Sequence, residues 1–147
     1  MPKGFAQRHA ISDVCILVAD VERSVRFYTE KLGFTLLHRA PGFADFSGAG
    51  LTLALWEIDH IAANSGVSAA RAPDVHKVVV AVKLSSPAEV DACHAELSAA
   101  GVPFQGPPAD YPWNARACYF AGPDAELWEL YAWHPGGAVG QLAAHDQ

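Results

Sequence analysis

The sequence has few residues of the kinds that mark disulfide-rich, zinc-ribbon or membrane-spanning proteins. Its three cysteines, Cys15, Cys93 and Cys118, lie far apart, and no Cys-x-x-Cys pair occurs. This spacing excludes a zinc ribbon and argues against a disulfide framework, so we expect reduced thiols and a cytoplasmic protein. No run approaches eighteen unbroken apolar residues, and the first residues lack the apolar core of a signal peptide. A membrane is therefore not an expected partner.

Basic residues are also scarce. The 147 residues include 10 Lys and Arg against 16 Asp and Glu, which gives a formal net charge of −6. Binding to a phosphate backbone requires clustered basic side chains, so a nucleic acid partner is excluded. The acidic balance instead suits a cationic small molecule. Apolar residues make up 51% of the chain, which is enough to form a core in one domain or in two small halves that share one.

The chain contains an internal repeat. In the first half a strand-like stretch, residues 11–18, is followed by Asp20 as a helix N-cap, and Gly33 stands where a helix would end. In the second half residues 76–84 are strand-like, Ser86 is the N-cap, and Glu89 completes a capping box. Three short strands are predicted after each helix, at 34–37, 42–46 and 51–56 and again at 102–104, 115–120 and 127–133.

This repeat predicts an α+β fold of two tandem βαβββ modules. We place the first module at residues 11–57, a crossing loop at 58–74, the second module at 75–133 and a flexible tail at 134–147. Each sheet would expose an apolar face if it stood alone. We therefore expect the modules to form a curved mixed sheet with helices outside and an open cleft that can hold a ligand.

Two segments resemble a known family. The first contains an Asp-x-x-x-Ser-x-x-Phe-Tyr-x-x-x-Leu-Gly-Phe pattern, here Asp20, Ser24, Phe27, Tyr28, Leu32, Gly33 and Phe34. The second is Gly-Pro-Asp-Ala-Glu-Leu-Trp-Glu-Leu at residues 122–130, where the family usually has Pro-Asp-Gly. Together with the repeat, these segments resemble the vicinal oxygen chelate superfamily, which includes glyoxalase I, extradiol dioxygenases and bleomycin resistance proteins.

The resemblance implies four positions that hold a divalent metal in metal-using members. They lie in the first and last strands of each module and here fall on Asp13, Ala54, Lys77 and Glu129. Alanine and lysine are poor ligands, and using His76 instead of Lys77 would turn its side chain to the other sheet face. No family-type metal site is therefore expected, although Asp13, His76 and Glu129 remain the candidate ligands if a divalent metal binds.

Glu129 is the residue on which the functional interpretation depends. It lies in an apolar strand and shares a face with Leu127, Tyr131 and Trp133. If Phe120 faces Leu127, then Cys118 faces Glu129 and Arg116 lies within reach, so an Arg116–Glu129 ion pair is one interpretation. Binding of a ligand is the other. The expected ligand-binding residues, mostly aromatic or charged, are Trp56, Lys77, Tyr111, Trp113, Asn114, Arg116, Glu129 and Tyr131. Phe46 and Trp133 add stacking surfaces, and Trp128 is expected in the core.

Four functions fit these features. The first, which we prefer, is a small-molecule-binding protein of the bleomycin resistance type, with no cofactor. The second is a metal-dependent lyase, isomerase or dioxygenase of the same superfamily. The third is metal-free acid–base catalysis by Glu129, and the fourth is a structural or regulatory domain. The family resemblance also implies a homodimer.

Overall fold

The helix of the first module begins at a side-chain cap and ends at a glycine. In the computed structural model, which describes residues 5–8, 11–48, 50–65 and 78–137, the Asp20 carboxylate accepts hydrogen bonds from the backbone N–H of Glu22 (2.9 Å) and Arg23 (3.2 Å). These bonds satisfy two amides that have no partner inside the helix. At the other end Gly33 has φ +78°, which suits glycine best. Both predicted helix limits are confirmed.

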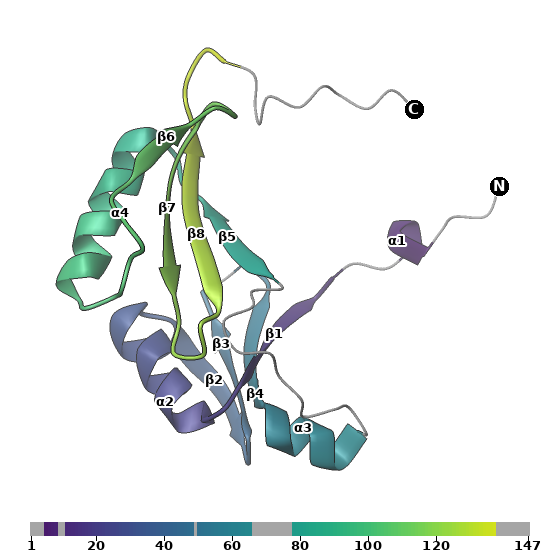
Figure 1. Cartoon of the computed structure of the whole chain (residues 1–147). Helices are drawn as coiled ribbons and strands as arrows, with labels where there is room; N and C mark the ends of the chain where they lie inside the picture. The colour runs from purple at the N-terminus through teal and green to yellow at the C-terminus, as the bar shows by residue number, and fades with distance from the viewer. Residues whose placement is uncertain (1–4, 9–10, 49, 66–77, 138–147) are drawn as a thin grey trace. The chain divides into compact units, whose positions relative to one another are not determined.

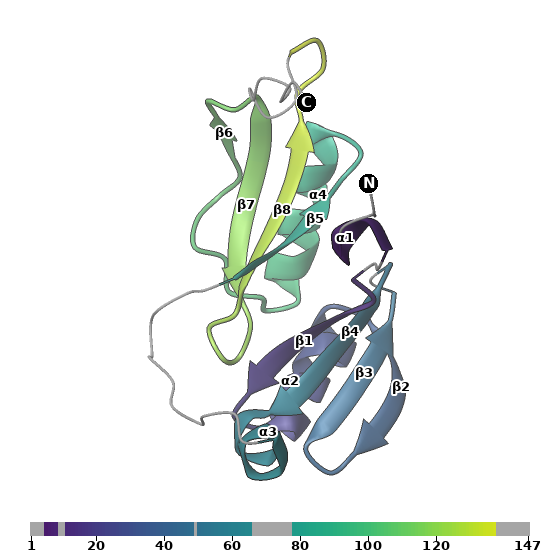
Figure 2. The ribbon, with the colours of Figure 1, turned by 90° about the vertical axis from the view of Figure 1, so that its right-hand side faces the viewer.

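The chain divides into two compact units, Met1–Arg71 and Ala72–Gln147. The first unit contains, in chain order, α1 (Phe5–Arg8), β1 (Asp13–Val18), α2 (Val21–Arg26) with its π-helical continuation η1 (Phe27–Lys31), β2 (Thr35–Ala40), β3 (Phe43–Ser47), β4 (Thr52–Glu57) and α3 (Ile58–Ser65). Its strands form sheet A in the order β1-β4-β3-β2 (Figure 2). Strand β1 pairs parallel with β4, and the other pairs are antiparallel. Sheet A is therefore mixed, as predicted.

The core of the first unit lies between sheet A and the helix formed by α2 and η1. Tyr28 and Phe46 are both fully buried, with ring centroids 5.8 Å apart, and Leu53 pairs across the sheet with Phe46. Burial of each such side chain contributes about 1.5–3 kcal/mol to folding. Phe46 was expected to offer a stacking surface for a ligand. That prediction is wrong, because its ring faces the helix.

The second unit repeats the order of the first. It contains β5 (Val79–Lys83), α4 (Pro87–Ala99), β6 (Ala109–Tyr111), β7 (Ala115–Ala121) and β8 (Leu127–Trp133), with sheet B in the order β5-β8-β7-β6 (Figure 1). Strand β5 pairs parallel with β8, as β1 does with β4. The predicted α+β fold of two βαβββ modules is confirmed. The strand predicted at 102–104 is reduced to a bridge between Phe104 and Phe120, and β6 takes its place in the sheet.

The cap of α4 differs slightly from the prediction. The backbone N–H of Glu89 donates to the Ser86 hydroxyl (3.2 Å), as a capping box requires. The Glu89 carboxylate, however, accepts from the backbone N–H of Ser85 (2.8 Å) rather than from that of Ser86. Hydrogen bonds from Ser85 lower the pKa of Glu89. The capping box is thus completed by the backbone N–H of Ser85, one residue before the N-cap, rather than by that of the N-cap itself.

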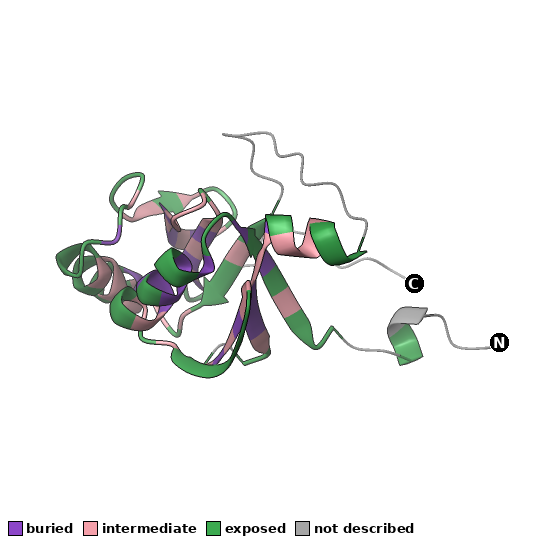
Figure 3. Ribbon diagram, turned by 90° about the horizontal axis from the view of Figure 1, so that it is seen from below, coloured by how far each residue is buried: buried purple, intermediate pink, exposed green. Residues whose placement is uncertain are grey.

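The core of the second unit lies between α4 and sheet B. Phe120 and Trp128 are nearly fully buried and stack at 5.8 Å, and Val90 of α4 is fully buried. Trp128 is therefore a core residue, as predicted. In both units most buried residues lie between the sheet and its helix (Figure 3). On the opposite face of the described strands the buried residues are alanines, Ala54 in sheet A and Ala115 and Ala117 in sheet B.

The segment expected to be a crossing loop contains a helix. Residues 58–65 form α3, whereas 66–74 lie outside the described residues. The sequence hides α3 because its Ala, Asn and Ser residues are typical of both loops and short helices. Of the predicted tail, residues 138–147 also lie outside the described part. Among the helices of the described ranges, none is both long and apolar enough to cross a bilayer.

Candidate functional site

Glu129 lies in the middle of β8, opposite Tyr119 of β7. The phenol Oη of Tyr119 donates a hydrogen bond to Oε2 of Glu129 at 2.5 Å. The prediction that Cys118 faces Glu129 is wrong by one residue, because Ala121 rather than Phe120 pairs with Leu127. A shift of one residue exchanges the two faces of a strand. Cys118 is therefore buried on the α4 side, and Tyr119 is the neighbour of the carboxylate.

The predicted Arg116–Glu129 ion pair does not form. Arg116 is on the α4 side of β7, where Nε and Nη2 donate to Oδ1 of Asp91 at 2.9 and 2.8 Å. Its Nη1 donates to Oδ1 of Asp110 at 3.2 Å, and His134 Nε2 lies 2.7 Å from the same oxygen. Hydrogen bonds from His134 and Arg116 lower the pKa of Asp110, and those to Asp91 and Asp110 raise the pKa of Arg116. Arg116 thus links β7 to Asp91 of α4 and Asp110 of β6, and its predicted contact with a ligand stays a prediction.

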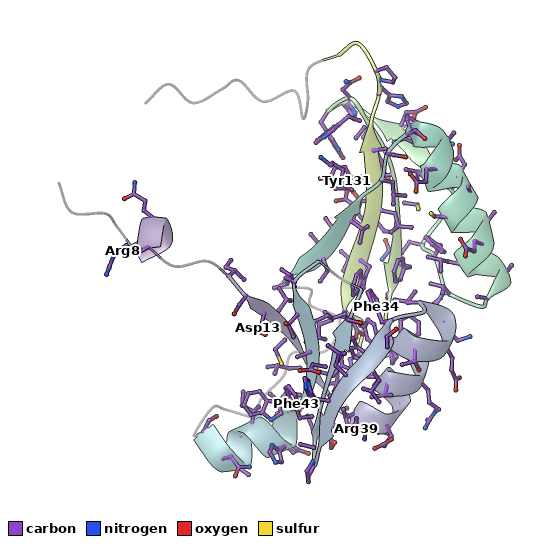
Figure 4. All side chains as sticks on the ribbon, turned by 180° about the vertical axis from the view of Figure 1, so that it is seen from behind. Arg8, Asp13, Phe34, Arg39, Phe43 and Tyr131 are labelled. Carbon is purple, nitrogen blue, oxygen red and sulfur yellow. The ribbon has the colours of Figure 1, made fainter. Side chains whose placement is uncertain are left out.

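Aromatic rings gather around Glu129 on the side of sheet B opposite α4. Tyr111 stacks on Trp113 at 4.7 Å and meets Tyr119 edge-to-face at 6.2 Å. Tyr131, which projects from β8 in Figure 4, lies 5.3 Å from the ring of Trp133. We call this surface the Glu129 face, and its members are Tyr111, Trp113, Tyr119, Glu129, Tyr131 and Trp133. Three of the predicted binding residues, Tyr111, Trp113 and Tyr131, are thereby brought together with Glu129.

Some polar atoms at and beside this face are engaged in hydrogen bonds within the protein. Burial, followed by the hydrogen bond to Glu129, raises the pKa of Tyr119, so its phenol stays protonated and keeps donating. Only Oε2 of Glu129 is used in this bond. Asn114, another predicted binding residue, has φ +63°, and its Nδ2 donates to the carbonyl oxygen of His134 at 3.1 Å. Asn114 therefore holds the loop that carries Trp113.

Trp56, a further predicted binding residue, belongs to the first unit. Its Nε1 donates to Nδ1 of His60 at 2.9 Å, and its ring meets Phe43 edge-to-face at 6.1 Å. Both contacts fix the indole on the face of sheet A opposite α2. Lys77 and His76 lie outside the described residues, so their predicted roles stay predictions.

The strand pairing changes one of the four metal positions implied by the family resemblance. Cys15 pairs with Ala54 in sheet A, and Ala81 pairs with Glu129 in sheet B. If Ala54 corresponds to Glu129, then Asp13 corresponds to Val79 rather than to Lys77. The N-caps support this alignment, because the same number of residues separates Asp13 from Asp20 and Val79 from Ser86. Two of the four positions therefore carry alkyl groups, and the described residues contain no group of three or more His, Cys, Asp or Glu side chains able to hold an ion.

Comparison with known proteins agrees with this fold. Residues 10–130 match the family model of the Glyoxalase/Bleomycin resistance protein/Dioxygenase superfamily, and the chain belongs to this family. A stretch of 40 residues is 45% identical to bleomycin resistance proteins of Geobacillus stearothermophilus and Staphylococcus aureus. That stretch covers 27% of this chain and spans only 30% of the length of those relatives.

Solved structures are similar over more of the chain. A glyoxalase/bleomycin resistance protein/dioxygenase from Nocardioides is 53% identical, with a TM-score of 0.85 over 92% of this chain and 91% of its own. A glyoxalase-related enzyme from Fulvimarina pelagi is 26% identical, with a TM-score of 0.71 over 93% of this chain and 99% of its own. A lactoylglutathione lyase from Agrobacterium tumefaciens is 20% identical, covers 84% of this chain and 92% of its own, and has a TM-score of 0.68. The last likeness shows the fold alone.

Tyr119 is the main site residue that sequence reasoning missed. The turn between β7 and β8 is closed by the backbone N–H of Gly122 donating to the carbonyl oxygen of Glu126 at 2.9 Å. A loop of five residues, 122–126, therefore separates the paired Ala121 and Leu127. Had the sequence been read with a five-residue loop, Tyr119 would have fallen opposite Glu129.

Proposed function

We propose that this protein binds a small organic molecule, preferably a cationic aromatic one, on the Glu129 face. The observation that carries the proposal is a carboxylate held by Tyr119 among aromatic rings. Glu129 is half-buried, and the other members of this face carry no positive charge, so a ligand cation would supply a countercharge at close range. The surrounding rings add cation–π and stacking contacts of about 0.5–2 kcal/mol each.

The proposal includes the absence of a family-type divalent ion. A catalytic metal needs about three protein ligands with defined geometry. The methyl group of Ala54 and the isopropyl group of Val79 supply no donor at two of the family positions. One oxygen of Glu129 is already engaged by Tyr119. The donor set therefore does not fit the metal site of the metal-using relatives, and no reaction step is assigned to an ion.

The bleomycin resistance proteins, whose name refers to an organic drug, support binding of an organic molecule as the general activity. Their similarity covers a short stretch, so it supports the class of activity and does not identify the ligand. The net charge of −6 also favours a cation, although through the long-range field rather than a contact. The predicted inter-module cleft, the homodimer and the cytoplasmic location stay predictions.

Calorimetric titration with a matched pair of probes tests this function. N-methylacridinium carries a permanent charge, and acridine is its neutral counterpart at neutral pH. We expect Glu129→Gln to weaken binding of N-methylacridinium by about 10-fold, which corresponds to loss of about 1.4 kcal/mol. Binding of acridine should change little. Glu96→Gln, which makes the same charge change at an exposed position of α4, is the control and should leave both affinities unchanged.

Two results would contradict the proposal. One is failure of both probes to bind the wild-type protein at millimolar concentration. The other is equal weakening by the substitutions at Glu129 and Glu96, which would indicate a general charge effect. Elemental analysis of the purified protein tests the metal separately, because a stoichiometric, tightly bound divalent ion would refute that part alone.

A further inference from the structure

A β-bulge in the edge strand β2 determines which way His38 points. Leu36 pairs with Phe46, whose ring contacts Tyr28 of the helix, so Leu36 belongs to the helix side of sheet A. Regular pairing would then place His38 opposite the fully buried Ala44, on the same side. Instead the register shifts after Leu36, and His38 pairs with Asp45. The shift moves the imidazole to the face opposite α2. Bulges that redirect a side chain in this way are frequent beside active sites.

The redirected imidazole forms a defined pair with Asp45. His38 Nδ1 lies 2.8 Å from Oδ1 and 3.1 Å from Oδ2 of the carboxylate. An ionised carboxylate only accepts hydrogen bonds, so Nδ1 carries the proton that it donates. The neutral imidazole then has its lone pair on Nε2. The Asp45 side chain is 14% exposed and that of His38 is 74% exposed, so the positioning group is shielded while the basic nitrogen is open to solvent.

The neighbours of this pair suit a planar organic molecule. Asp45 pairs with Ala54, and Ala54 pairs with Cys15, so small side chains continue the row. The next pair along β3 and β4 is Phe43 and Trp56, whose rings meet at 6.1 Å. Phe43 is labelled on sheet A in Figure 4. The indole of Trp56 beside the His38–Asp45 pair has a fixed orientation, because its Nε1 donates a hydrogen bond to His60.

We propose that His38 is a general base, positioned by Asp45, for small planar molecules that carry a weakly acidic C–H or O–H group. In the step, Nε2 takes the proton and the electron pair of the broken bond stays on the substrate. The imidazolium is stabilised by the Asp45 carboxylate and later returns its proton to water. This activity is independent of the Glu129 face and requires no metal or cofactor.

The second unit offers a contrasting histidine. His134 also pairs with an aspartate, but through Nε2, and its partner Asp110 is shared with Arg116. No bulge separates the paired residues of β6 and β7 around Asp110. The His134–Asp110 pair therefore closes a structural network, and it is the matched control for a test of His38.

The elimination reaction of 5-nitrobenzisoxazole tests the proposal with a chemically defined probe. A base removes the proton at C3, the C–H electron pair completes a nitrile, and the N–O bond breaks to give 2-cyano-4-nitrophenolate, which is followed by its absorbance. At neutral pH we expect kcat/KM to exceed the rate constant of free imidazole by about 100-fold. His38→Gln should lower it at least about 10-fold. His134→Gln should leave it unchanged.

A spectroscopic measurement separates positioning by Asp45 from a merely structural role. We expect ¹⁵N NMR of the wild-type protein to show His38 protonated on Nδ1, and Asp45→Ala to shift it toward the Nε2-protonated form while kcat falls about 10-fold. Asp45→Asn gives the same kinetic comparison if Asp45→Ala does not fold. His38 is largely exposed, so His38→Gln is expected to fold in any case.

Each of several outcomes would overturn the proposal. Turnover no faster than with free imidazole would remove the evidence for a positioned base. Equal rates for the wild type and His38→Gln would place the base elsewhere, as would an equal loss in His134→Gln. An unchanged tautomer and rate in both Asp45 variants would leave His38 without a positioning partner.

Discussion

Removing the Tyr119–Glu129 hydrogen bond should measurably destabilise the second unit. The bond is 2.5 Å long and joins a phenol to a carboxylate, a class that contributes about 1.5–3 kcal/mol. Because both side chains are only partly buried, water competes for the same atoms, and we expect about 1–2 kcal/mol. In a double-mutant cycle of Tyr119→Phe and Glu129→Ala, which removes the acceptor, the coupling energy should therefore be about 1–2 kcal/mol.

Urea denaturation followed by tryptophan fluorescence measures this cycle, and pH adds a second test. The pKa of Tyr119 in the folded protein is raised above its ordinary value of 10.0. Its contribution to stability is thus complete below that pH and is lost as the pH rises through the folded-state pKa. Tyr119→Phe should abolish this alkaline loss. A coupling energy below about 0.3 kcal/mol, within the additivity of independent sites, would refute the reasoning.

Three further predictions concern stability and thiol reactivity. Asp20→Ala removes the N-cap of α2 and should lower the free energy of unfolding by about 1 kcal/mol in urea, whereas Asp20→Asn should retain most of it. Ala125 has φ +63°, so Ala125→Gly should raise stability by up to about 1 kcal/mol; a loss of stability would show that the turn is not strained. Burial raises the pKa of the Cys118 thiol to about 11 from 9.0. At neutral pH the folded protein should hence carry about 100-fold less Cys118 thiolate and react that much more slowly with a disulfide reagent than the urea-unfolded chain, as measured by mass spectrometry.

The local signals in the sequence predict much of the fold. Each of these signals acts within a few residues, so the residues that predict a feature are also the ones that produce it. They are the capping residues Asp20 and Ser86, the glycine at position 33 and the alternation in β8. The second strand of the second module was misplaced. Its position depends on pairing with β7, and the short β6 has no pattern of its own that distinguishes it from a loop.

The candidate site was predicted only in part for the same physical reason. Glu129 and Tyr131 share a face because alternation within β8 is local. Tyr111 and Trp113 reach that face through the pairing of β6 with β7 and the stacking of their two rings. The partner of Glu129 depends on the register between two strands, which the length of the turn determines. That turn is one residue shorter than assumed, so Arg116 was assigned to the wrong face and Tyr119 was overlooked.

The bulge in β2 lets the edge strand of sheet A hold one extra residue without changing which side chains of the following pairs face outward. Deleting Leu37 alone would remove the bulge, and His38 would then follow Leu36 directly and still lie opposite Asp45 on the open face. In the evolution of such a strand, insertion or deletion of one residue at this point is therefore absorbed locally. A gap at this position in a comparison of homologues would not by itself indicate loss of the His38–Asp45 pair.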